Sequence, residues 1–170
     1  MRTVTNDEIE ASVDRIHGMS ESDTREFATQ MTKEQPILQV YIAAICERGD
    51  FTDENDMDAF ANLASIVWHA MRTAAGGRLT KVKEREIDKR ESKMMQLFEY
   101  AEEESDADFP RMVAAWTEDY NQRPLLEFVV ETLMSPKNPY GVTPGGSGPI
   151  FTYLKVIIDC LDNAKIKKKF

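Results

Sequence analysis

The two histidines are the side chains best suited to metal binding or acid–base chemistry, and neither stands in a complete motif. His17 follows Asp14 by three residues, so the two could share one face of a helix. Two ligands are fewer than the three or four that a metal site needs, and His17 next to Gly18 favours contact with helix-end carbonyls. His69 lies beside Trp68 in an apolar run, which is typical of a hydrogen-bonded, partly buried imidazole. We therefore predict no metal site.

The acidic and nucleophilic side chains also lack a catalytic arrangement. A calcium loop counted from Asp53 would need glycine at its sixth position, where the chain has Asp58. No Gly-x-Ser-x-Gly motif is present, and Cys46 and Cys160 lie in apolar runs, as buried reduced thiols do. The sequence thus predicts no catalytic residue and no cofactor. A hydrolase that uses an unrecognised pair of acids stays open as an alternative.

A glycine-rich loop, PGGSGP, precedes the last predicted helix. Its backbone amides could hold an anion at the start of that helix, but the Gly-Lys-Ser/Thr ending of a Walker loop is missing. The loop is then either a flexible connection or a mobile lid over a small-molecule pocket. Aromatic and polar groups that interrupt the helical apolar runs would line that pocket. The candidate ligand-binding residues are Tyr41, Trp68, His69, Trp116, Gly145, Gly146 and Ser147.

The elements that would position these side chains are helices, because apolar residues recur with a 3.6-residue period almost throughout the chain. A long, charged helix is expected over residues 79–104. The sequence predicts an all-α fold, a closed bundle of about seven to eight helices in a single domain over residues 1–170. Helix start signals stand at Thr5, Ser20 or Ser22, Pro36, Thr52 or Asp53, Asp108 and Pro124, and stop signals at Gly18, Gly49 and Gly76-Gly77.

The chain also contains a possible internal repeat. When Pro36 is placed over Pro124, an apolar helix, a polar loop and an amphipathic helix follow in the same order in both segments. This comparison predicts two related halves, residues 20–76 and 106–164, joined by the helix over residues 79–104. The two apolar helices would pack against each other, and the amphipathic helices would flank them. Chance similarity between amphipathic helices is the alternative.

The charge and the distribution of apolar residues argue against nucleic-acid binding, a membrane span and a secretory signal. The chain has 170 residues and a net charge of −9, which disfavours nucleic acid as a ligand because phosphate binding needs a basic face. A membrane span is not expected, since no apolar stretch of 18 residues is present. The polar, acidic start MRTVTNDEIE differs from a secretory signal, so a cytoplasmic location is expected.

The charge is also unevenly distributed along the chain. Residues 78–93 hold seven bases and four acids and lie between two acidic stretches. Such complementary bands favour antiparallel pairing of the basic arm with an acidic stretch, within the chain or across a homodimer, and an ordinary charged surface helix is the alternative. We therefore expect a non-catalytic soluble protein that acts in protein–protein interaction or regulation, with small-molecule binding as the alternative. The candidate residues of the arm are Lys83, Arg85, Lys89 and Arg90.

Overall fold

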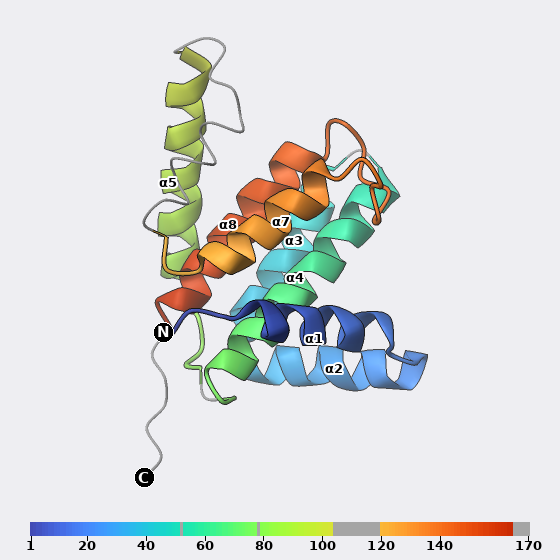
Figure 1. Ribbon diagram of the computed structural model, residues 1–170. Helices are drawn as coiled ribbons and strands as arrows, with labels where there is room; N and C mark the ends of the chain where they lie inside the picture. Colours follow the sequence, from blue (N-terminus) through green and yellow to red (C-terminus); the bar gives the residue numbers. More distant parts are fainter. Residues whose placement is uncertain (52, 78, 104–119, 165–170) are drawn as a thin grey trace.

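A computed structural model describes residues 1–51, 53–77, 79–103 and 120–164, with residues 97–103 described by their backbone alone (Figure 1). Within these ranges the secondary structure consists of seven helices, which confirms the predicted all-α fold. The helix expected after Asp108, and Trp116 within it, lie outside the described residues. The helices are α1 (Asn6–His17), α2 (Glu21–Glu34), α3 (Pro36–Glu47), α4 (Glu54–Ala74), α5 (Glu84–Glu103), α7 (Arg123–Met134) and α8 (Ser147–Asp162).

Most helices begin where the local sequence predicts. Thr5 and Glu8 form a capping box at the start of α1: the Thr5 side chain accepts from the backbone amide of Glu8, and the Glu8 side chain accepts from the backbone amide of Thr5. Ser20 caps α2 and Asp53 caps α4 through side-chain oxygens. Pro36 occupies the first turn of α3, where its missing N–H costs nothing. The N-termini of these helices are thus set by residues that are close to one another in the sequence.

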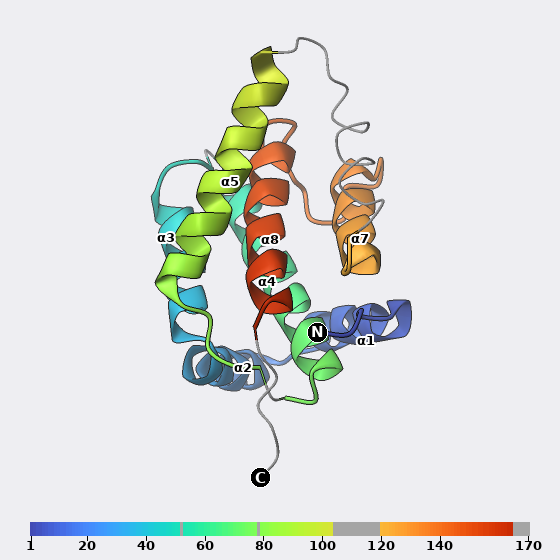
Figure 2. The same ribbon diagram turned by 90° about the vertical axis from the view of Figure 1, so that its left-hand side faces the viewer.

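The centre of the bundle is the pair α4 and α8, which pack against each other (Figure 2). α1 packs across α4, α5 runs along α8, and α3 and α7 lie on opposite sides of this central pair (Figures 1 and 2). The expectation that the apolar helices α3 and α7 would form the central pair is therefore wrong. Each of them leaves an apolar side chain in solvent: Val40 on α3 is 65% exposed and Met134 on α7 is 54% exposed.

The charged helix starts later than predicted. α5 begins at Glu84, whereas residues 79–83 run without helical structure. The buried side chain of Gln35 holds this segment: its Nε2 donates to the Thr80 carbonyl at 3.0 Å, and its Oε1 accepts from the Val82 amide at 2.8 Å. A side-chain amide thus takes the place of helical hydrogen bonds. The sequence of residues 79–83 alone does not predict this non-helical conformation, because the side chain that holds it, Gln35, lies 45 residues before Thr80 in the chain.

A second buried glutamine makes the same pair of contacts at the other end of the chain. Gln122 Nε2 donates to the Arg2 carbonyl at 3.0 Å, and its Oε1 accepts from the Val4 amide at 3.0 Å. Gln122 also donates to Asp162 at the end of α8, at 2.7 Å. Each glutamine precedes a proline-containing helix, and each holds alternate backbone groups of a segment that leads into a helix. We call these two contacts the glutamine clamps.

Candidate functional site

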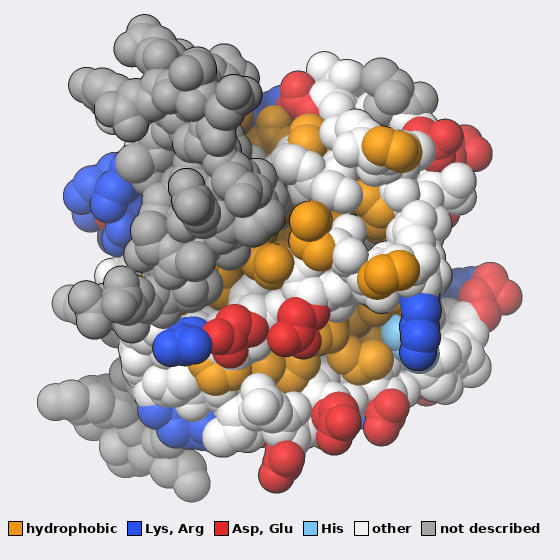
Figure 3. Space-filling view, turned by 45° about the horizontal axis from the view of Figure 1, so that its top comes forward, with side chains coloured by type: hydrophobic (Ala, Val, Ile, Leu, Met, Phe, Trp, Pro, Cys, Tyr) orange, Lys and Arg blue, Asp and Glu red, His pale blue; other side chains and the backbone are white. Residues whose placement is uncertain are grey.

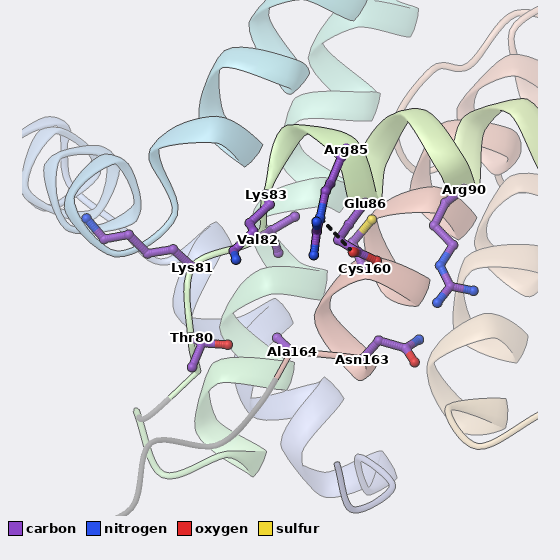
Figure 4. A pocket seen from close by; sticks show the side chains of 10 residues that line it. All are labelled: Thr80, Lys81, Val82, Lys83, Arg85, Glu86, Arg90, Cys160, Asn163 and Ala164. Atoms are coloured by element: carbon purple, nitrogen blue, oxygen red, sulfur yellow. Dashed lines mark ion pairs between the residues drawn. The ribbon is translucent and has the colours of Figure 1, made fainter.

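The described residues form a cationic cleft of about 480 Å³ where the segment before α5 meets the end of α8 (Figure 4). Its charged lining consists of four cations and one carboxylate, so the cleft is positive although the chain as a whole is acidic. Three of the four residues predicted for the basic arm, Lys83, Arg85 and Arg90, line it. The fourth, Lys89, is exposed on α5 and is not part of the lining. The full lining is Thr80, Lys81, Val82, Lys83, Arg85, Glu86, Arg90, Cys160, Asn163 and Ala164.

Buried neighbours keep these cations at the surface. Val82 and Ile87 are 5% and 3% exposed, so they anchor the segment and the first turn of α5 against the core. Because Val82 faces inward in the segment held by Gln35, its sequence neighbours Lys81 and Lys83 are exposed. The glutamine clamp therefore fixes the position of the lysines that line the cleft.

The cations of the cleft are incompletely neutralised by the described residues. Arg85 Nε lies 3.5 Å from the Glu86 carboxylate, a loose pair on an arginine side chain that is 77% exposed. Arg90 has its Nε buried without a hydrogen-bond partner among the described residues. A buried donor without an acceptor costs about 1–3 kcal/mol.

Cys160 forms part of the cleft wall. Its burial is the main reason that the pKa of its thiol is raised to about 12, although nearby Arg90 acts in the opposite direction. Since only the thiolate is a strong nucleophile, Cys160 contributes a neutral, largely apolar surface. The cleft is suited to binding an anion by charge and hydrogen bonding.

A buried lysine on α8 is a feature that the sequence reasoning missed. Lys155 Nζ lies 2.8 and 2.7 Å from the two carboxylate oxygens of Asp159 and 4.2 Å from the centre of the Tyr120 ring. The Tyr120 hydroxyl donates to the same carboxylate at 2.6 Å. Burial lowers the pKa of Lys155 and Asp159 opposes this shift. The i,i+4 spacing of a lysine and an aspartate inside an apolar helix was the available signal.

Two aromatic residues of the predicted small-molecule pocket, Trp68 and Tyr41, pack against different aromatic partners. Trp68 is 1% exposed and packs edge-on against Phe27, with ring centres 5.0 Å apart. Tyr41 packs against Tyr153 of α8, with ring centres 6.3 Å apart. Trp116 lies outside the described residues. The described rings thus contribute to the core.

His69 of that set hydrogen-bonds to a serine, a pairing that also occurs in hydrolases. Its Nδ1 lies 2.9 Å from Ser12 Oγ, and Ser12 Oγ donates its single proton to the Glu8 carbonyl at 2.7 Å. His69 must therefore donate to Ser12, which is the reverse of what a general base does. Ser12 is also 1% exposed. This pair joins α4 to α1 and does not activate a nucleophile.

The glycine-rich loop is held by a buried carboxylate. Asp56, 1% exposed, accepts hydrogen bonds from the Thr143 amide at 2.7 Å and from the Thr143 hydroxyl at 2.6 Å. A Cβ at Gly146 would overlap this carboxylate, so the position requires glycine. Asp56 therefore places negative charge beside the start of α8, where the helix dipole favours it. The predicted residues Gly145, Gly146 and Ser147 connect α7 to α8 next to that charge.

A second hollow, of about 410 Å³, lies between α1 and α7. It has the opposite character, because acidic side chains border an apolar floor; hydrophobic and acidic side chains lie side by side on this face in Figure 3. We call it the acidic groove. Its lining residues are Asn6, Ile9, Glu10, Val13, Pro124, Glu127, Phe128 and Glu131.

The described residues contain neither a cluster suited to a metal ion nor a membrane-spanning helix. Among the described residues, no group of three or more His, Cys, Asp or Glu side chains is placed to hold a metal ion. His17 instead lies 2.9 Å from the Tyr140 hydroxyl through its Nε2. No helix within the described ranges is long and apolar enough to cross a membrane. The chain matches no protein-family model, no curated protein and no solved structure.

Proposed function

We propose that this protein is a non-catalytic binding protein that takes an acidic segment of a partner protein into its cationic cleft. The observation that carries the proposal is the excess of cations there: four basic side chains surround a concave surface that has one carboxylate. Opposite charges across an interface raise the association rate and select the partner. An acidic peptide segment is the complementary ligand.

The chemistry of the lining supports binding over catalysis. The guanidinium groups of Arg85 and Arg90 have only N–H donors and no acceptor, so they cannot act as bases. The Cys160 thiol is held neutral by burial. The two guanidinium groups can position an anion, and neither they nor the neutral thiol activate a nucleophile.

Binding of a labelled acidic peptide to the full chain, followed by fluorescence anisotropy, tests the proposal. We expect the double variant Lys83→Glu/Arg85→Glu to weaken binding about tenfold or more, because both cations face the cleft. The matched control is Arg25→Glu, an exposed change on α2 outside the cleft. Equal affinity of the wild type and the double variant would refute the proposal.

A second copy of the chain is a further candidate partner, favoured by the acidic groove between α1 and α7. Its rim carries Glu10, Glu131 and Glu127, of which Glu127 pairs with Arg123 at 2.7 Å, and its remaining charge is opposite to that of the cationic cleft. Size-exclusion chromatography with light scattering should then show a dimer that is lost when Lys83, Arg85, Lys89 and Arg90 are all changed to Glu. A wild-type monomer at every concentration would exclude this candidate.

We also infer that the chain consists of two related helical units, residues 1–77 and 79–164, with α5 as the counterpart of α1. The glutamine clamps support this, because each joins the start of one unit to the residue just before the proline-containing helix of the other. Val4 and Val82 are the buried residues at the two clamps, and Ile9 and Ile87 follow each by five residues and are also buried. Under this proposal residues 79–104 begin the second unit and do not merely link two halves.

The repeat has a testable consequence for the isolated first unit. Residues 1–77 contain Gln35 and also the Arg2–Val4 segment, so two copies could exchange clamps across a twofold axis. We expect light scattering to give the mass of a dimer for this fragment. A folded monomer would contradict the inferred equivalence of the two clamps.

A further inference from the structure

We propose that the cationic cleft recognises a phosphorylated side chain, phosphoserine or phosphothreonine, within the partner's acidic segment. This inference rests on the proposed function and names the group that occupies the cleft. It follows from a comparison of the two clamped helix starts, from the state of Arg90, and from the charge balance of the lining.

The start of α1 shows how the chain neutralises a cation internally. Arg2 donates to both carboxylate oxygens of Glu8, and Glu8 also accepts from the Thr5 amide at 3.0 Å. The arginine pair holds the pKa of Glu8 down, at about 2. At this helix start, a built-in carboxylate lies against the cation that precedes the helix.

The start of α5 has the same framework but a different charge balance. Glu86 follows Val82 by four residues, as Glu8 follows Val4. Glu86 pairs only loosely with Arg85, at 3.5 Å, and three further cations line the same cleft. The internal carboxylate that balances the first site is insufficient here. The geometry therefore leaves room for an anion from outside.

Arg90 indicates which kind of anion fits. Its Nε is buried and has no hydrogen-bond partner within the described part of the chain. In Figure 4 its side chain extends past Cys160 on the same side as Asn163, away from the Arg85–Glu86 pair. A guanidinium group binds phosphate or carboxylate through two parallel hydrogen bonds, and because Nε is buried, the two terminal nitrogens of Arg90 are the donors for such a contact.

The charge of the lining favours phosphate over carboxylate. A phosphorylated side chain carries about −1.5 to −2 charge and three acceptor oxygens, whereas a carboxylate carries a single charge. The Lys83 carbonyl accepts from the amides of Glu86 and Ile87, so α5 starts beside the cleft with its first amides directed towards the N-terminal end. A helix start of this kind adds favourable potential for an anion. The excess of cations over carboxylates in the lining, together with a helix start, matches a dianion better than a monoanion.

Three peptides of one acidic sequence, with serine, phosphoserine or glutamate at the central position, test the inference against the full chain by calorimetry. We expect the phosphopeptide to bind about tenfold more tightly than the serine peptide, because it adds charge-assisted hydrogen bonds. Its advantage over the glutamate peptide should shrink as pH falls through about 6, where the phosphate loses its second charge.

Two variants separate a phosphate contact from general attraction. Arg90→Lys keeps the charge but removes the fork, so it should weaken the phosphopeptide about tenfold and the glutamate peptide less, because a carboxylate has fewer acceptor oxygens and less charge to pair with it. Arg85→Gln alters an exposed side chain without disturbing the core and should weaken both peptides. Arg25→Gln on α2 is the matched control and should change neither.

The outcomes distinguish this inference from the proposed function. If the glutamate peptide binds as tightly as the phosphopeptide, the phosphate inference falls and the acidic-segment function stands. If none of the three peptides binds, both fall. Inorganic phosphate and a short RNA are added as competitors; if either binds as tightly as the phosphopeptide, the ligand is not a phosphorylated protein segment and the inference is overturned.

Discussion

Replacing Gln35 by methionine tests whether the glutamine clamp builds the cationic cleft. Methionine has nearly the same length and volume as glutamine, so the core contacts of the side chain are largely retained. The change removes the two hydrogen bonds to the Thr80 carbonyl and the Val82 amide. It therefore isolates the polar contribution of the clamp.

The expected loss follows from the surroundings of the two backbone groups. The Val82 amide is buried at its hydrogen bond, so leaving it without an acceptor costs about 1–3 kcal/mol. The Thr80 carbonyl is only partly buried, and water can replace part of its bond. Together we expect Gln35→Met to lower the free energy of unfolding by about 2–4 kcal/mol. Because Lys81 and Lys83 belong to the same segment, peptide affinity should fall as well.

Urea denaturation followed by circular dichroism measures the change, with the midpoint and the slope fitted together. Gln122→Met should cost at least as much, since Gln122 has the same two contacts and a third to Asp162. Gln96→Met on the exposed face of α5 is the control and should stay within about 0.5 kcal/mol of wild type. If Gln35→Met also stays within that range, the clamp does not hold the segment and the reasoning fails.

Three further changes test other parts of the structure. Gly146→Ala forces a methyl group into a buried carboxylate and should lower the free energy of unfolding by about 1–3 kcal/mol in urea denaturation, whereas Gly145→Ala, with open space around it, should not. The pairing with Arg2 depresses the pKa of Glu8, so its stabilisation is present above the ordinary value of 4.5 and is lost as pH falls towards about 2; the stability difference between wild type and Glu8→Gln should vanish over that range. Because burial raises the pKa of Cys160 to about 12, its alkylation at pH 8, followed by mass spectrometry, should be about 100-fold or more slower in the folded than in the unfolded chain, and equal rates would contradict its burial.

The helices themselves could be predicted from the sequence because their boundaries depend on neighbours in the chain. The capping box of Thr5 with Glu8 joins residues three apart, and Pro36 acts through its own ring. The residues of the basic arm were also found in this way, because charge is a property of the residue itself. Lys83, Arg85 and Arg90 all line the cleft.

The relations between distant segments could not be predicted in the same way. Whether an apolar helix is central depends on which helices cover it, and Val40 is exposed because α3 packs at the side of the α4–α8 pair. The start of α5 depends on Gln35, and the form of the glycine-rich loop depends on Asp56, which lies 87 residues before Thr143. Local propensity and composition carry no information about such contacts, because they form only when folding brings the partners together. The cleft therefore forms only when the helices pack together, whereas the charges of the residues that line it are determined by the sequence.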